Sequence, residues 1–207
     1  MKPLCLLFFA ALLFAAPGIR AQETTPDGIV QSVTDEVLKR LREDKDIQAG
    51  NLNKINDLVN TKVLPYFNFR RMTQLAVGRD WRQASAAQRD ELTQQFRDLL
   101  IRTYANAVVA YRDQKVNYKP FRMNPGDTEV LVRTEIVQPG GKPITLDYSL
   151  EKVGDSWKVY DVVVGGVSLV INYRDNFAQE IRAGGIDGLI RTLTEKNKAL
   201  LAEKDKA

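Results

Sequence analysis

The sequence predicts a single α+β domain in which helices cover one face of a curved antiparallel meander sheet of four strands. Apolar residues recur at helical spacing as far as residue 112, alternate with polar residues from 116 to 164, and then return to helical spacing. Short glycine-containing turns separate the alternating segments, and such turns favour antiparallel neighbours. Helices that flank a run of strands are typical of an α+β domain with one core.

The N-terminus has the features of a cleaved secretory signal peptide. Met1-Lys2 is positively charged, Leu4–Ala16 is an apolar run too short to span a bilayer, and Ala21 is a small residue at a suitable cleavage position. We therefore expect residues 1–21 to be removed and residues 22–207 to form one domain. A segment of this kind is typical of a bacterial periplasmic protein.

Four helices are expected before the strands. Ser85 and Gln88 form a capping box, in which each side chain satisfies a free backbone N–H of the other residue. The expected helices are one from Thr25-Pro26 to about Lys45, one from Asn51 to Leu64 that Pro65 stops, one around Phe69–Ala76 that breaks near Gly78, and one from Ser85 to about Arg112.

The strands follow from strict alternation. Ile144, Leu146, Tyr148 and Leu150 alternate with polar residues, which predicts a half-buried strand with one apolar face. The four expected strands are Val116–Pro120, Glu129–Val137, Ile144–Glu151 and Trp157–Val164. After Gly165-Gly166 we expect a helix over Leu169–Ile181 that ends at Gly184-Gly185, and a last helix over Ile186–Leu201.

Composition limits the chemistry. The chain has no His, and its only Cys, Cys5, lies in the expected signal peptide. The usual proton-transfer side chain and the usual zinc ligands are therefore missing from the mature chain, so an enzyme would have to rely on carboxylates, Tyr, Lys or Ser. We expect no metal, no cofactor and no enzymatic activity. Removing Lys2 and Arg20 from the 30 basic residues leaves 28 against 26 acidic residues, a net charge too small to indicate nucleic-acid binding.

Three motifs in order resemble the MlaC family, which is also called the toluene-tolerance auxiliary family. They are V-L-P-Y-F-N-F-R-R-M-T-Q-L-A-V-G-R-D-W-R-Q-A-S-A-A-Q, F-R-D-L-L-I-R-T-Y-A-N-A-V-V-A-Y, and G-V-S-L-V-I-N-Y-R-D-N-F followed by G-I-D-G-L-I. The resemblance covers most of residues 22–207. It implies a fold of the nuclear-transport-factor-2 type, with an apolar cavity between a curved sheet and helices.

The resemblance also implies a function. Members of the family are soluble periplasmic carriers that hold one phospholipid as cargo and maintain the lipid asymmetry of the outer membrane. The implied partners are an inner-membrane ABC transporter with a ring-forming lipid-binding subunit and an outer-membrane lipoprotein associated with porins. We expect a monomer that binds no nucleic acid. Two acyl chains require a cavity at or above the upper end of the roughly 300–1,000 Å³ of ordinary pockets.

Candidate cavity residues come from the apolar faces of the helices and strands. They are Tyr66, Met72, Leu75, Ala76, Val77, Leu99, Tyr104, Val108, Tyr111, Val132, Leu146, Tyr148, Val162, Val164, Val167, Leu169, Val170 and Tyr173. Periodicity shows which face is apolar, but packed core residues give the same pattern. Arg70, Arg71 and Arg79 are candidates for contact with the lipid phosphate or with a partner, since Arg suits phosphate.

Two alternatives remain open on the sequence alone. An enzyme of the same fold would need a carboxylate or Tyr with a shifted pKa inside the cavity, and Asp147 and Asp161 are the nearest candidates. A periplasmic chaperone or adaptor would use an open apolar groove for peptide. A deep, closed cavity argues against the groove.

Overall fold

The structure, a computed structural model, describes residues 25–110, 114–137 and 140–204. The expected signal peptide lies outside these residues, as does Tyr111. The elements are α1 Pro26–Glu43, α2 Lys45–Gln48, α3 Leu52–Leu58, π-helical η1 Val59–Val63, 3-10 helix η2 Leu64–Tyr66, α4 Phe69–Val77, 3-10 helix η3 Gly78–Arg82, α5 Ala86–Ala110, β1 Lys115–Tyr118, β2 Glu129–Val137, β3 Ile144–Val153, β4 Ser156–Val164, β5 Val167–Ser168, 3-10 helix η4 Ile171–Tyr173 and α6 Arg174–Lys204.

The predicted helix starts are confirmed by their side-chain caps. Thr25 Oγ1 accepts from the N–H of Gly28 at 3.3 Å before α1. Ahead of α5, Gln88 Oε1 accepts from the N–H of Ser85 at 2.9 Å, and Ser85 Oγ accepts from the N–H of Gln88 at 3.2 Å. These bonds satisfy backbone donors that a helix leaves free at its start.

The sheet is an antiparallel meander with strand order β1-β2-β3-β4-β5. The expectation of four strands missed β5, which pairs Val167 with Val164 and Ser168 with Val163. Gly165 and Gly166, with φ of 57° and 88°, turn the chain back tightly enough for this pairing. The expected helix over Leu169–Ile181 is therefore wrong in its first turn, and α6 begins only at Arg174.

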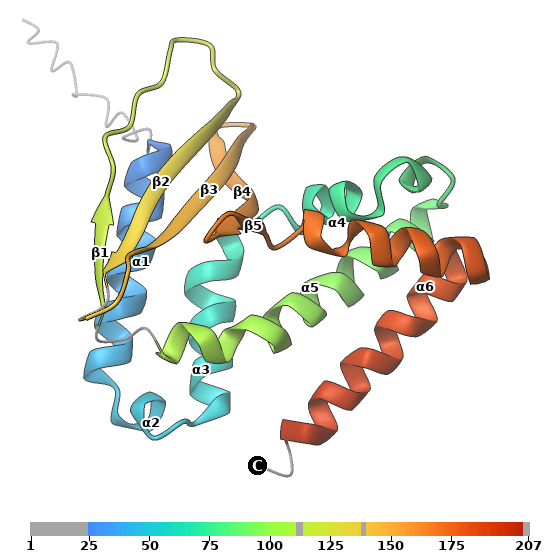
Figure 1. The fold of residues 1–207 in the computed structure, drawn as a ribbon, viewed down its shortest axis with the longest axis horizontal. Coiled ribbons are helices and arrows are strands. Elements are labelled where there is room, and N and C mark those ends of the chain that lie inside the picture. Colours follow the sequence, from blue (N-terminus) through green and yellow to red (C-terminus); the bar gives the residue numbers. More distant parts are fainter. Residues whose placement is uncertain (1–24, 111–113, 138–139, 205–207) are drawn as a thin grey trace, which may run out of the picture.

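The predicted break at Gly184-Gly185 is confirmed inside α6. Gly185 has φ 67° and ψ −171°, which is not a helical conformation and which is almost restricted to glycine. In Figure 1 the two arms of α6 fold back on each other at this point, and the first arm runs beside α4 and α5. The helical half of the molecule is thus formed by α4, α5 and α6, whereas α1 packs against the sheet and α3 packs against α1 and α2.

A β-bulge decides which residues of β4 face α1. Ser149 pairs with Asp161 and Leu150 pairs with Val159, so Tyr160 is an extra residue on β4. The bulge puts Val159 and Val162 on one face although they are three residues apart. We call this face, which packs against α1, the inner face of the sheet.

Candidate functional site

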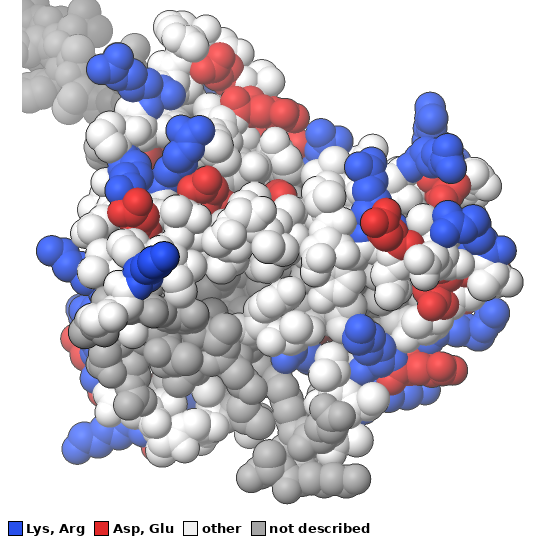
Figure 2. Space-filling view, viewed as in Figure 1, with Lys and Arg blue, Asp and Glu red and all other residues white. Residues whose placement is uncertain are grey.

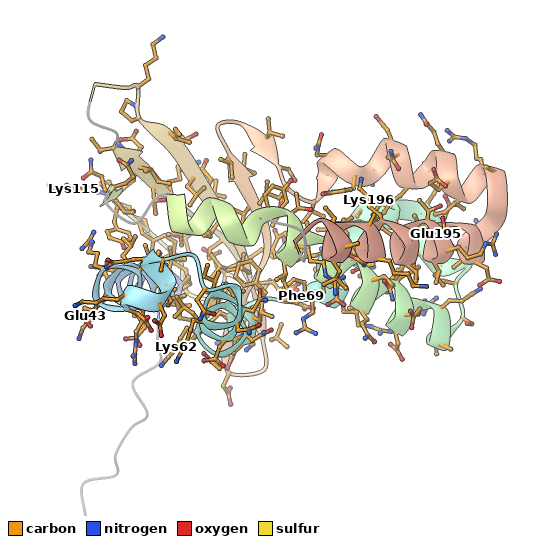
Figure 3. The ribbon with its side chains drawn as sticks, turned by 90° about the horizontal axis from the view of Figure 1, so that it is seen from below. Glu43, Lys62, Phe69, Lys115, Glu195 and Lys196 are labelled. Carbon is orange, nitrogen blue, oxygen red and sulfur yellow. The ribbon has the colours of Figure 1, made fainter. Side chains whose placement is uncertain are left out.

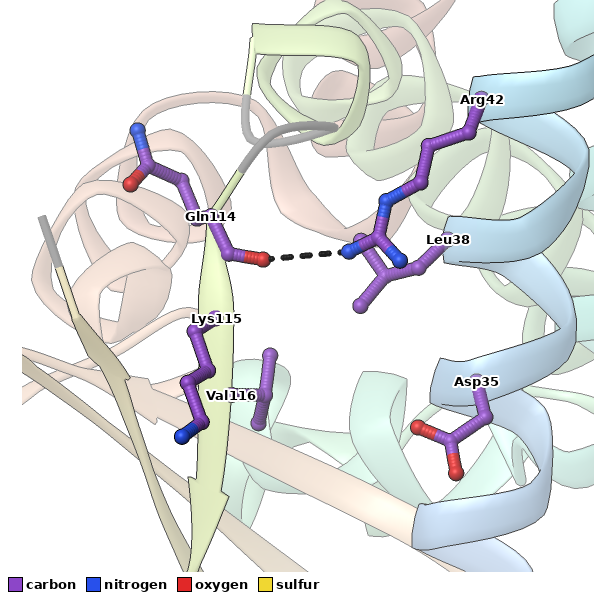
Figure 4. Close-up of a pocket in the computed structure, with 6 residues that line it drawn as sticks. All are labelled: Asp35, Leu38, Arg42, Gln114, Lys115 and Val116. Atoms are coloured by element: carbon purple, nitrogen blue, oxygen red, sulfur yellow. Dashed lines mark hydrogen bonds between the residues drawn. The ribbon is translucent and has the colours of Figure 1, made fainter.

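A cavity of about 330 Å³ lies between α1 and β1. Its lining residues are Asp35, Leu38 and Arg42 of α1, Gln114 just before β1, and Lys115 and Val116 of β1. Figure 4 shows Asp35, Leu38 and Arg42 directed from one face of α1 toward the strand. The volume is at the lower end of the range for small-molecule sites and below the volume expected for two acyl chains.

Two hydrogen bonds join α1 to the segment that carries β1. An Nη of Arg42 donates to the backbone carbonyl of Gln114 at 3.4 Å (Figure 4). Farther along the strand, the Tyr118 hydroxyl donates to Asp35 Oδ1 at 2.9 Å. Burial and then the hydrogen bond to Asp35 raise the pKa of Tyr118 above its ordinary value, so this phenol stays protonated as a donor.

Apolar side chains continue from this cavity in two directions. Leu38 packs against the buried cluster of Val37 and Leu41 between α1, α2 and α3. Val116 pairs with buried Ile136 of β2 on the inner face. The cavity is therefore an opening at the edge of a larger apolar region.

The inner face brings together seven of the residues that the sequence singled out. Val132 and Val162 are buried, and the other five are half-buried and pack against the same cluster, which also contains Ile29 and Val30 of α1. The seven are Tyr66, Val132, Leu146, Tyr148, Val162, Val164 and Leu169. Burial raises the pKa of Tyr148 to about 12, so its hydroxyl is neutral at physiological pH.

Eight other candidates lie in the helical half, where they pack on one another and on Phe96, Phe177 and Leu189 of α5 and α6. They are Met72, Leu75, Ala76, Val77, Leu99, Tyr104, Val170 and Tyr173. The rings of Phe96, Tyr173 and Phe177 contact one another with centroids 5.1–5.5 Å apart. The structure therefore separates the candidate list into two clusters, and contact of this second cluster with a ligand stays a prediction.

Three candidates belong to neither cluster. Val167 is 53% exposed at the turn into β5. Val108 is in α5, but its side chain is outside the described part of the structure, as is the whole of Tyr111.

The three candidate arginines have different surroundings. Arg70 Nη1 contacts Asp90 Oδ1 at 2.7 Å, and its guanidinium lies over the Trp81 ring. Arg71 contacts Glu129 at 3.5 Å and Glu151 at 3.6 Å on the sheet face opposite the inner face, so it connects α4 to the sheet. Arg79 is exposed on η3 and forms no ion pair within the described residues. A role in headgroup or partner contact stays a prediction for all three.

The buried carboxylate of Asp161 has a structural environment. Its residue is 8% exposed, and burial raises its pKa. Oδ1 accepts from the N–H of Val162 at 2.8 Å, and Oδ2 accepts from the Ser168 hydroxyl at 2.7 Å. Ser168 Oγ in turn accepts from the N–H groups of Val170 and Ile171 at 3.2 and 2.9 Å. Asp161 therefore orders the turn between β4 and η4, on the side of the sheet away from the inner face.

Sequence reasoning missed the residues that line the α1–β1 cavity. Leu38 and Val116 lie in the expected first helix and first strand, but nothing in their spacing marks a cavity, and charged side chains such as Asp35 and Arg42 look like an ordinary solvated helix face. Only the placement of α1 across β1 distinguishes them. Among the described residues no group of three or more potential metal ligands comes together, and no described helix is long and apolar enough to cross a membrane.

Comparison with known proteins gives consistent matches. The family model described as "MlaC protein" matches residues 31–195. The "Intermembrane phospholipid transport system binding protein MlaC" of Haemophilus influenzae is 26% identical over 193 residues, with 92% of this chain and 90% of that protein covered. The "Toluene tolerance protein ttg2D" of Pseudomonas putida is 27% identical over 177 residues, with 85% and 82% covered.

A solved structure is also similar. It is a phospholipid-binding protein from Ralstonia solanacearum in complex with a phospholipid, and it is 41% identical in sequence with a TM-score of 0.77. The similarity covers 84% of this chain and 98% of that one.

Proposed function

The chain belongs to the MlaC protein family, and from this premise we propose that it is a lipid-binding transport protein, not an enzyme, whose cargo is a phospholipid. The observation that carries the proposal is the apolar inner face, which meets the α1–β1 cavity at its edge. The solved relative supports it, since a protein 41% identical to this chain was obtained with a phospholipid bound.

Physical chemistry explains why such a protein has to enclose its cargo. Each CH₂ group taken from water into an apolar site contributes about 0.8 kcal/mol, so the roughly 30 CH₂ groups of two acyl chains make a free phospholipid in water very unfavourable. Transfer from a bilayer to an apolar protein cavity is nearly neutral in comparison. A carrier therefore works by covering the chains, and the transfer itself needs no nucleotide or catalytic group.

The cavity of about 330 Å³ is too small for both chains. The chains therefore extend along the inner face, and α1 and the sheet separate farther when the lipid is bound. Half-buried side chains such as Leu146, Tyr148 and Val164 are suited to this role, because they already contact the cluster without being fully enclosed.

The finer parts of the proposal concern where the carrier works. The signal-peptide pattern of residues 1–21 supports export to the periplasm. There the monomeric carrier shuttles phospholipid between an inner-membrane ABC transporter with a ring-forming subunit and an outer-membrane lipoprotein associated with porins, and so maintains lipid asymmetry. The curated relative is named for an intermembrane phospholipid transport system, which supports this pathway.

The test is to express the chain in a Gram-negative periplasm and to purify it without detergent. Native mass spectrometry should show a stoichiometric mass excess that organic extraction identifies as phospholipid. A bare polypeptide mass that stays unchanged after incubation with phospholipid vesicles would refute the carrier function and favour a peptide-binding groove.

A matched pair of variants locates the lipid. Leu146 is on the inner face, whereas its neighbour Thr145 is exposed on the opposite face of β3. Leu146→Trp should fill the space next to the inner face and reduce the bound phospholipid, while Thr145→Trp should leave it unchanged. Circular dichroism confirms that both variants fold. Equal lipid content in the two folded variants would exclude the inner face as the acyl-chain site.

A further inference from the structure

The α1–β1 cavity has a cation at one end, an anion at the other, and apolar side chains between them. Asp35, Leu38 and Arg42 are spaced so that they share one face of α1 over two turns. Figure 4 shows this face opposite β1, with Val116 completing the apolar middle. The cavity therefore has a charged side chain at each end and apolar side chains in the middle.

The two charged groups are close enough to act on one small molecule. Arg42 follows Asp35 by seven steps of the helix, which is a rise of roughly 10 Å along the axis. A long helical side chain leans toward the helix N-terminus, so the guanidinium of Arg42 reaches back toward Asp35 and shortens this gap. Each group is also held in place, Arg42 by the Gln114 carbonyl and Asp35 by the Tyr118 hydroxyl.

We propose that this cavity receives the headgroup of a zwitterionic phospholipid, with the phosphate at Arg42 and the ammonium group at Asp35. The inference rests on the proposed lipid-carrier function and specifies its substrate class. The planar guanidinium has five N–H donors, which can serve a carbonyl and a phosphate together. A carboxylate has about four lone-pair sites, so Asp35 accepts from an ammonium group as well as from Tyr118.

The apolar middle of the cavity determines where the acyl chains leave the headgroup. Leu38 and Val116 contact the start of the acyl chains, which then follow the inner face that Val116 shares with Ile136. An anionic headgroup without an ammonium group would place like charge near Asp35, and this disfavours it. Lys115 also lines the cavity, so it adds a second cation that can contact the phosphate, whereas Asp35 supplies the carboxylate for the ammonium group.

The charge arrangement is local to this end of the molecule. Figure 3 shows Lys115 and Glu43 at the end opposite Glu195 and Lys196 of α6. On the face shown in Figure 2, basic and acidic side chains are interspersed and form no large field of one sign. This face therefore offers no single-sign potential for headgroup selection, which depends on the individual contacts in the cavity.

A competition experiment tests the proposal with an internal standard. The purified chain is incubated with vesicles that contain phosphatidylethanolamine, phosphatidylglycerol and a smaller amount of diacylglycerol, all with the same acyl chains. The protein is then re-isolated, and its bound lipids are quantified by mass spectrometry. Ratios between lipids are compared, so a variant that binds less lipid overall still gives a result.

The variants remove one charge at a time. Arg42→Gln should lower the ratio of each phospholipid to diacylglycerol about three- to tenfold, because a charge-assisted contact to phosphate is lost at a partly exposed site. Asp35→Asn keeps an acceptor for Tyr118 but should lower the ratio of phosphatidylethanolamine to phosphatidylglycerol by a similar factor. Lys39→Gln and Glu43→Gln, which change charge on α1 outside the cavity lining, should leave all ratios unchanged.

The outcomes separate this inference from the function on which it rests. If the wild-type protein takes up no lipid, the carrier function itself fails. Lipid uptake with ratios that neither cavity variant changes, or that the control variants change equally, would overturn the headgroup site and leave the carrier function standing. An excess of glycerophosphoethanolamine should not displace the lipid. Displacement by this chain-free headgroup would overturn the assignment to an intact lipid.

Discussion

Replacing Ser168 by Ala should destabilise the fold more than the loss of a partly buried hydroxyl group usually does. The Ser168 hydroxyl donates to the buried Asp161 carboxylate at 2.7 Å, and a hydrogen bond to a charged group contributes roughly 1.5–3 kcal/mol. Its oxygen also accepts from two backbone N–H groups, which water can partly replace at the exposed Ile171. We therefore expect a loss of about 2–3 kcal/mol in the free energy of unfolding, or roughly 4–12 °C in Tm.

The loss should depend on pH in a defined direction. Burial raises the folded-state pKa of Asp161, so the folded protein binds more protons there than the unfolded chain, and this site's contribution to stability falls as pH rises through the folded pKa. The Ser168 bond opposes this shift, since it lowers the pKa of Asp161. Without it the shift grows, so the destabilisation should be larger at pH 7 than near the ordinary aspartate pKa of 3.8.

The assay is guanidinium denaturation of lipid-free protein, because bound lipid would itself shift the midpoint. Ser156→Ala, at an exposed position on β4, is the control and should change stability little. In an Asp161→Asn background, Ser168→Ala should cost much less than in the wild type. An equal cost in both backgrounds, or one that does not vary with pH, would show that the carboxylate–hydroxyl bond does not hold this turn.

Two further substitutions test other parts of the fold. Gly185→Ala should destabilise by about 1–3 kcal/mol, because a φ of 67° with a ψ of −171° is strained for any residue with a Cβ, although no atom lies within 4 Å of the added carbon. Gly184 has no positive φ, so Gly184→Ala should lower the Tm less than Gly185→Ala does. Equal Tm values for the two variants would contradict a strained conformation at Gly185. Arg71→Met should lower the free energy of unfolding in urea by about 1 kcal/mol, since a side chain that is only 32% exposed loses its contacts with two carboxylates and with the ring of Tyr160. Arg70→Met removes a more exposed pair and should cost less, so the reverse order would refute the role of Arg71 in joining α4 to the sheet.

The helix starts and the strand faces followed from the sequence because they depend on local interactions. A capping box such as Ser85–Gln88 closes within one turn, and its hydrogen bonds form whatever surrounds the helix. The alternation that contains Leu146 and Tyr148 identifies the apolar face of β3 from the sequence of that strand alone. Family membership also followed from sequence, since ordered motifs carry it.

The position of the bulge and the division of the apolar residues were decided by tertiary structure. Tyr160 is an extra residue only in relation to the register of β3, and that register turns Asp161 away from the inner face. Met72 and Leu146 are equally apolar in the sequence, but one packs among helices and the other on the sheet. The hydrophobic effect has no directional preference, so the hydrophobicity of a side chain does not identify the residues against which it packs. The α1–β1 cavity exists for the same reason, because Arg42 and Gln114, 72 positions apart, meet only when α1 packs across the edge of the sheet.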